Sequence, residues 1–116
     1  MKVFHCDHCG QLLFFENVAC VACGRAVGYV PELAAMVSLD PAGAGAWRSP
    51  LVRGALRFCA NHAAHDVCNW ALDASDAASL CRACRLTRTI PNLGKPGNRR
   101  LWYRLEVAKR RLVYTL

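Results

Sequence analysis

Eight cysteines are the residues of this 116-residue chain whose type and spacing can do chemistry. Six of them form three Cys-x-x-Cys pairs, and two stand singly. Structural zinc takes four tetrahedral ligands, often thiolates, and keeps no open position. Eight cysteines therefore suffice for two structural zinc ions. Pairing by neighbourhood predicts two groups: Cys6, Cys9, Cys20 and Cys23, then Cys59, Cys68, Cys81 and Cys84. An interleaved arrangement, in which pairs from both halves share one zinc, stays open.

Disulfides and thiol redox chemistry are the alternatives to metal binding. The stretch from Met1 to Cys6 lacks the apolar run of a secretory signal, and no run approaches the ~18 apolar residues that would span a membrane. We therefore expect a cytoplasmic protein, in a reducing compartment where disulfides do not persist. A redox protein normally needs one Cys-x-x-Cys pair at a helix start within a βαβ unit, and the sequence predicts no such unit.

The first group has the more specific pattern. Gly10 and Gly24 each follow a Cys-x-x-Cys pair directly, as expected for tight metal-binding knuckles whose backbone needs a positive φ. The ten residues between the two pairs are enough for one short β-hairpin. In the second group, eight residues separate Cys59 from Cys68, so one side lacks the compact knuckle. Trp70 is predicted to cover this second site.

The four histidines are less informative. His5 and His8 flank the first knuckle, and four cysteines already satisfy a zinc ion there, so we expect surface groups or groups around the ligands. His62 and His65 form an HxxH pattern that would either bind a catalytic metal or line a loop beside the second zinc. The second interpretation is favoured. His65 as a ligand in place of Cys59 stays open.

No known catalytic pattern is visible in the sequence. A zinc protease usually carries HExxH on a helix, and none of the three glutamates lies between histidines. No Ser-His-Asp order, P-loop or GxGxxG pattern occurs either, and cysteines that bind metal are not free nucleophiles. We expect that this chain is not an enzyme by itself.

The fold class that these patterns predict is a small, metal-stabilised α+β protein, because so short a chain buries a modest core and needs staples. Three segments are expected. They are a zinc ribbon at 1–39, a second four-cysteine zinc module with short strands at 40–94, and a basic amphipathic helix at 95–116.

Shorter elements follow from composition. A strand at 27–30 is expected to stop at Pro31, and residues 40–45 have the composition of a loop. Strands are expected around Trp47 and at 51–58.

The C-terminal helix is predicted from residue 99, with Asn98 as its N-cap. One stripe of a 3.6-residue period carries apolar side chains, with Trp102 and Val113 at its edge. The stripe is Leu101, Leu105, Ala108, Leu112 and Leu116. We expect Leu101, Trp102 and Leu105 to lie on the zinc modules. The pattern continues to the last residue without a cap, as in a chain cut from a longer one, so its distal part is predicted to pack on a downstream domain or on a second copy.

The net charge favours a mildly basic protein. The formal charge is +7, but a zinc ion with four thiolates carries −2, so two sites lower the total to about +3. From Arg82 to Leu116 there are ten Lys or Arg residues and one acid, Glu106. These cations could bind nucleic acid phosphates, which is the alternative function, or could offset the zinc–thiolate charge.

Several motifs resemble the N-terminal zinc-ribbon region of bacterial proteins classed as zinc-binding metallopeptidases. These are the segments 4–10, 14–17, 20–24, 59–61, 68–70, 81–91 and 106–112. The resemblance covers nearly the whole chain and is weakest at 40–55. It implies that Cys6, Cys9, Cys20 and Cys23 bind structural zinc, and that a downstream domain with an HExxH-type metal site supplies any peptidase chemistry. The expected role of the chain is then to brace or gate that domain, or to recruit its substrate.

Overall fold

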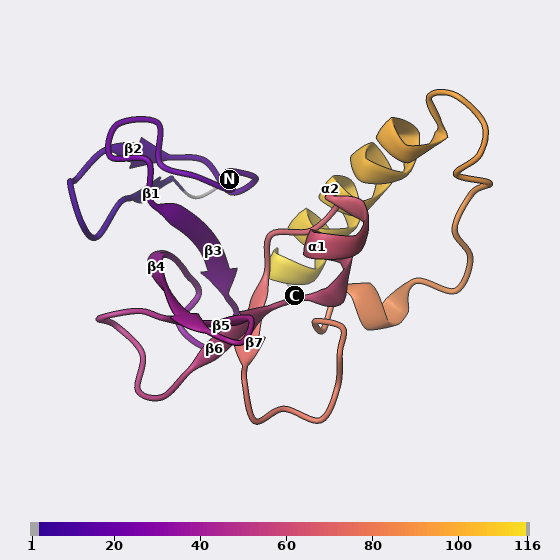
Figure 1. Cartoon of the computed structure of the whole chain (residues 1–116). Helices are drawn as coiled ribbons and strands as arrows, with labels where there is room; N and C mark the ends of the chain where they lie inside the picture. Colours follow the sequence, from indigo (N-terminus) through magenta and orange to yellow (C-terminus); the bar gives the residue numbers. More distant parts are fainter. Residues whose placement is uncertain (1–2, 116) are drawn as a thin grey trace.

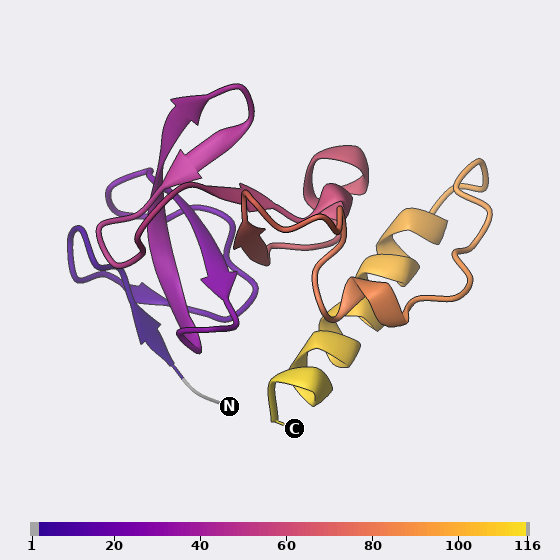
Figure 2. The ribbon, with the colours of Figure 1, turned by 90° about the horizontal axis from the view of Figure 1, so that it is seen from below.

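Two antiparallel sheets and two helices make up the computed structural model, which describes residues 3–115. A two-stranded sheet pairs β1 (Phe4–His5) with β2 (Leu12–Leu13), and a five-stranded sheet has the order β3-β4-β5-β6-β7. Its strands are Ala26–Val30, Ala35–Gly43, Ala46–Arg48, Leu56–Phe58 and Ala71–Asp73, and the helices are α1 (Ala60–His65) and α2 (Asn98–Thr115). Figures 1 and 2 show the strands gathered at one end and both helices at the other. The predicted small α+β class is confirmed.

The hairpins differ from the sequence prediction in two places. The first hairpin, β1–β2, turns through the first knuckle and does not lie between the two Cys-x-x-Cys pairs. The strand β3 ends at Val30 before Pro31, as predicted, but β4 continues to Gly43 through residues assigned to a loop. Beyond Leu39 this part of β4 leaves β3 and pairs with β5, with an irregular register between Pro41 and Gly43. Proline is tolerated here because, among the described residues, this stretch pairs only with β5 and the strand is irregular.

The central part of the chain has fewer strand residues than the sequence predicts. Of the stretch 51–58, only Leu56–Phe58 forms a strand, β6, and 51–54 is a turn with Gly54 at φ +75. The predicted boundary between residues 39 and 40 falls inside β4. The five-stranded sheet therefore contains residues from both predicted zinc modules.

The core has an aromatic centre. Phe15 lies against Tyr29 with ring centroids 4.9 Å apart, and Tyr29 lies against Trp70 at the same distance. Tyr114 of α2 contacts Phe15 at 5.2 Å and Tyr29 at 5.7 Å. Buried cysteines of both groups belong to the same apolar cluster as these rings. The two sulfur groups thus share one core.

The edges of the five-stranded sheet meet beside the second cysteine group. The Tyr29 backbone N–H donates to the Asn69 carbonyl at 2.9 Å, and Tyr29 forms a parallel bridge with Trp70, which precedes β7. At Gly28 an added Cβ would lie 2.9 Å from a ring carbon of Phe58 and 3.1 Å from the Asn69 carbonyl oxygen. A side chain at residue 28 would therefore push the Phe58 ring and the Asn69 backbone away from β3.

The helix α2 begins at Asn98, one residue earlier than predicted, so Asn98 is its first residue and not its N-cap. The Gly97 carbonyl accepts the Leu101 N–H at 3.1 Å, so Gly97, with φ +83, precedes the first helical residue. The Asn98 side chain donates to the Asn92 carbonyl at 2.9 Å. Among the described residues, no helix is long and apolar enough to cross a membrane.

The face of α2 that packs on the protein is not the leucine stripe. Trp102, Glu106 and Arg110 are buried, whereas Leu101, Leu105 and Leu112 are 55%, 70% and 60% exposed. The prediction that Leu101 and Leu105 lie on the zinc modules is therefore wrong, and Trp102 alone of that set is buried. Leu116 lies outside the described residues.

Long side chains that carry hydrogen-bonding groups explain why this face of the helix is buried, although Arg110 Nε itself has no hydrogen-bond partner. The Glu106 carboxylate accepts from the Trp102 indole N–H at 2.8 Å and from the Thr87 hydroxyl at 2.6 Å, and it pairs with Lys109 at 2.6 Å. Arg110 donates to the Val67 carbonyl at 2.6 Å. Buried polar groups are tolerated when they are hydrogen-bonded in this way.

Candidate metal centres

The first cysteine group consists of two matching knuckles. The Gly10 N–H donates to the Cys6 carbonyl at 2.8 Å, and the Gly24 N–H donates to the Cys20 carbonyl at 2.9 Å. Both glycines have positive φ, +81 and +76, as the sequence predicts. Most side chains would be strained at this φ, so the two glycines let each knuckle close.

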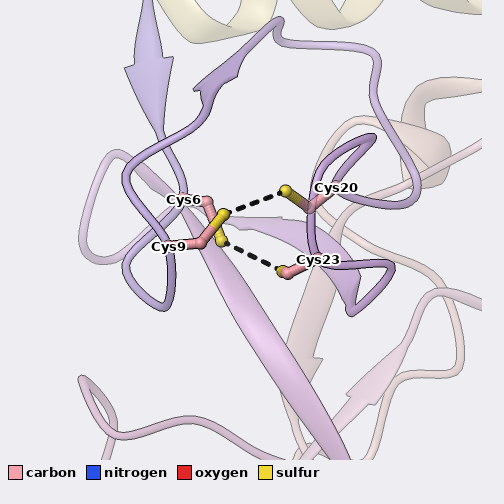
Figure 3. Close-up of side chains that lie close together, drawn as sticks. All are labelled: Cys6, Cys9, Cys20 and Cys23. Carbon is pink, nitrogen blue, oxygen red and sulfur yellow. Dashed lines mark hydrogen bonds between the residues drawn. The ribbon is translucent and has the colours of Figure 1, made fainter.

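These knuckles bring four sulfur atoms together. Cys6 and Cys9 face Cys20 and Cys23 across a small gap (Figure 3). The Sγ atoms of Cys6 and Cys23 are 3.8 Å apart, and those of Cys9 and Cys20 are 3.5 Å apart. A tetrahedral zinc with Zn–S bonds of about 2.3 Å separates its sulfurs by about 3.8 Å. A disulfide would need about 2.05 Å, so the spacing fits a shared metal.

The second group is assembled from three separate places in the chain. Cys59 lies between β6 and α1, and Cys68 follows α1. Cys81 lies three residues before Cys84, which is the first residue of a 3₁₀ turn (Cys84–Leu86). The Sγ atoms of Cys68 and Cys81 are 3.7 Å apart, again the separation expected around zinc. In each group all four Sγ atoms lie within 4.8 Å of one another. The two groups are those predicted by neighbourhood pairing, and that every member binds zinc stays a prediction.

Backbone N–H groups point at the sulfurs of the second group. The Cys81 N–H donates to Cys59 Sγ at 3.3 Å, the Cys84 N–H to Cys81 Sγ at 3.4 Å, and the Trp70 N–H to Cys68 Sγ at 3.5 Å. Such donors stabilise negative charge on sulfur and orient the ligands. Trp70 is fully buried beside Cys68, in line with its predicted covering role.

Crowding gives the thiols of each group unequal pKa values. The backbone N–H of Cys23, followed by that of Ala22, lowers the pKa of the Cys20 thiol to about 6. In the second group, hydrogen bonds from Cys68 and the other two thiols hold the pKa of Cys59 far below its ordinary value, and the same contact raises that of Cys68. Four adjacent sulfurs cannot all ionise without a cation, and a divalent metal supplies the compensating charge. Both groups are therefore suitable for zinc.

Solvent access separates the two groups. Cys9 is exposed and Cys23 half-buried, whereas Cys59, Cys68, Cys81 and Cys84 are all buried. In the part of the chain that the structure describes, no histidine joins either group.

His5 and His8 are exposed beside the first group, and His62 and His65 lie near the second. His62 stacks on Phe58 with ring centroids 4.0 Å apart, and its Nδ1 lies 2.9 Å from the Cys68 carbonyl oxygen. His65 lies 5.2 Å from the Trp102 ring. Both histidines of the HxxH pattern lie on α1. His62 contacts the loop that carries Cys68, and His65 faces α2. Cys59, and not His65, completes the second group.

Asn69 is a structural residue that the sequence pattern did not reveal. Its amide donates to the carbonyls of Phe15 and Asn17, at 2.8 and 2.9 Å, from a buried position next to Cys68. These bonds tie the loop of the second group to the segment between the two knuckles of the first. An asparagine between a cysteine and a tryptophan carries no periodic signal by which this role could be found.

Comparison with known proteins agrees with this geometry. A family model described as a zinc-ribbon domain matches residues 3–95. Uncharacterized proteins of Mycobacterium bovis and of two strains of Mycobacterium tuberculosis are 36% identical over 118 aligned residues, which cover the whole of this chain. The chain spans about 30% of the length of these curated relatives. No solved structure matches it.

Proposed function

Since the chain belongs to the zinc-ribbon domain family, we propose that it is a zinc-stabilised structural and interaction module that braces or gates a larger metallopeptidase region of the same protein. The observation that carries this proposal is the use of the eight cysteines. All lie in two groups of four sulfurs, a ligand set typical of structural zinc, which leaves the metal no open position for a substrate. The module is proposed to be non-catalytic by itself and to act in the cytoplasm.

The length of the relatives supports a role within a larger protein. They are about three times as long as the aligned region, since the chain spans 30% of them. The metallopeptidase assignment rests on the motifs quoted above and is proposed on that basis alone. A structural zinc module whose C-terminal helix keeps one apolar face exposed is suited to positioning a neighbouring domain.

The test is a substitution in one of the longer mycobacterial relatives. The residue aligned with Cys68 is changed to serine, and thermal stability, zinc content and peptidase activity of the whole protein are compared with wild type. We expect one structural zinc to be lost, while the remaining region keeps its own metal but loses stability or control of activity. Unchanged stability and activity after loss of the structural zinc would contradict the bracing role.

A nucleic-acid-binding zinc ribbon is the second candidate. The exposed arginines of α2 favour it, because its one acid, Glu106, is buried. Phosphate binding falls steeply with salt, so a titration with a DNA duplex at low and high salt separates this function from packing of an apolar surface.

A further inference from the structure

The outward face of α2 carries an apolar line that nothing covers among the described residues. Leu101, Leu105 and Leu112 are more than half exposed, and Ala108 between them is exposed as well. Single exposed leucines are ordinary on protein surfaces. Four apolar residues in one line on one helix form a continuous surface, here called the leucine seam.

The spacing of the leucine seam is that of a coiled coil. Its members follow one another at intervals of four, three and four residues, the alternation of positions a and d in a heptad. This makes a narrow line of two positions in seven, whereas helices that face a globular core usually show a broader apolar stripe. The small Ala108 leaves a gap between its larger neighbours Leu105 and Leu112 into which a partner side chain can fit.

Positive charge borders the seam. Arg104 and Arg111 are exposed and occupy one flanking position of successive heptads, whereas Lys109, on the other flank, is half-buried and already paired with Glu106. Glu106 is the only acid between residues 98 and 115, and it is buried against Trp102 and Thr87. Arg111 also pairs with Glu16 at 2.6 Å, with half of the Arg111 side chain still exposed. The outward face of α2 therefore combines leucine with arginine and offers no exposed acid.

We propose that the leucine seam binds an acidic amphipathic helix, which packs along α2 as a short two-stranded coiled coil. The partner helix carries its own a and d apolar line, and glutamate or aspartate at the positions that face Arg104 and Arg111. This inference rests on the proposed interaction role and names the chemistry of the partner.

Charge argues against a second copy of the chain as the occupant. Two α2 helices packed in parallel would place Arg104 of one against Lys109 of the other, and the antiparallel arrangement would place arginines near arginines. Like charges at these flanking positions oppose pairing. The charge pattern selects a partner of opposite sign.

The shape of the seam argues against a membrane surface. Helices that lie on a bilayer present a wide apolar face with Trp, Phe or Leu at its centre. On α2 the aromatic side chains of Trp102 and Tyr114 face the protein, where Trp102 is buried and Tyr114 packs on Phe15 and Tyr29. The exposed side keeps a narrow line with an alanine in its middle.

Two synthetic helical peptides test the proposal on the whole zinc-loaded chain. Both have the same leucine heptad line, one with glutamate and the other with lysine at the flanking positions. Fluorescence anisotropy is measured at low and high salt. We expect the glutamate peptide to bind at least about tenfold more tightly than the lysine peptide, with a preference that shrinks as salt screens the charges.

Variants locate the binding to the seam. Leu105→Asp should weaken binding of the glutamate peptide by about tenfold or more, as for a central interface residue. Arg104→Glu should reduce the preference for the glutamate peptide and improve binding of the lysine peptide. The matched controls are Leu33→Asp and Arg53→Glu, which change exposed residues outside α2 and should leave binding unchanged. Zinc content and near-UV circular dichroism verify that each variant is folded.

Several outcomes would overturn the proposal. They are no binding of the glutamate peptide, equal binding of both peptides, a peptide-free dimer abolished by Leu105→Asp, or Leu105-dependent binding to phosphatidylcholine–phosphatidylglycerol vesicles in place of the peptide. The bracing role is tested separately, by the substitution at the position aligned with Cys68 in the longer relative. If the peptide binds this chain but that substitution changes neither stability nor activity of the relative, the leucine seam proposal stands and the bracing role is wrong.

Discussion

The first cysteine group joins two knuckles that are close in sequence, whereas the second lies where α1, the start of β7 and the 3₁₀ turn meet. The first closes two knuckles of similar geometry within one short stretch, and two of its cysteines reach solvent. The second draws its ligands from separate elements and is wholly buried. Both groups consist of four cysteines, but their roles differ. The first metal would hold together two knuckles that are close in sequence, and the second would connect segments that are distant in sequence. The experiments below test this difference, from the largest expected effect to the smallest.

Complete removal of metal is expected to unfold the protein. A structural zinc contributes about 10 kcal/mol or more, as much as the whole stability of a small domain. With a strong chelator, one zinc should leave first without loss of the near-UV signal, and the second should leave with that signal. Zinc release and circular dichroism, followed together, check the order. Simultaneous release of both ions would mean that the two groups form one cooperative unit.

Single ligand substitutions should separate the groups. Cys68→Ser removes a buried ligand next to Trp70 and Asn69, and we expect an unfolded or aggregated protein. Cys9→Ser removes an exposed ligand, and we expect a folded chain that binds one zinc with full occupancy and the other weakly. Native mass spectrometry counts the ions. A folded Cys68→Ser protein with one zinc would show that the second metal is not what holds the distant segments together.

The link between the groups is predicted to be Asn69. Asn69→Ala leaves the carbonyls of Phe15 and Asn17 without this donor, and each unsatisfied buried group costs about 1–3 kcal/mol. Thermal unfolding should show a lower Tm, and the first zinc should leave faster. The control is Asn92→Ala, at an exposed loop position outside both cysteine groups. Equal release of the first zinc in both variants would show that the groups are independent.

The smallest effect is expected at the surface pair that joins α2 to the first module. Glu16 accepts from Arg111 at 2.7 Å across 95 residues of sequence. Partly exposed ion pairs contribute about 0–1 kcal/mol, so Glu16→Gln should barely change the free energy of unfolding. Glu106→Gln is the comparison, because its carboxylate is buried with three partners and its loss should cost several times more. Denaturant unfolding of both variants at low and high salt measures the difference.

The cysteine groups could be predicted from sequence because their chemistry is carried by residue type and short spacing. Gly10 and Gly24 marked the knuckles for the same reason, since few other residues take their positive φ. The burial of α2 could not be predicted in this way. Periodicity identified an apolar stripe, but Trp102 and Arg110 reach the core with hydrogen-bonded polar ends, and the leucines were left outside.

Pairing with a neighbouring strand explains why part of the predicted loop at residues 40–45 belongs to β4. Residues 40–45 have the composition of a loop, yet Asp40 pairs with Arg48 and Pro41 with Trp47 across the β4–β5 hairpin. Composition describes what a segment prefers alone, and a neighbouring strand can override that preference. Asn69 was invisible for a related reason, because its partners lie more than fifty residues earlier.

The order of the cysteines along the chain has a consequence for biosynthesis. The ribosome completes the first ligand set at Cys23, long before Asn69 and the last ligand, Cys84, emerge. Because folding proceeds during translation, the nascent hairpin can acquire its ion while the core is still being made. The polypeptide is then loaded in two steps, and a cell short of zinc would accumulate chains arrested between them, with a finished N-terminal knuckle pair and an open aromatic core.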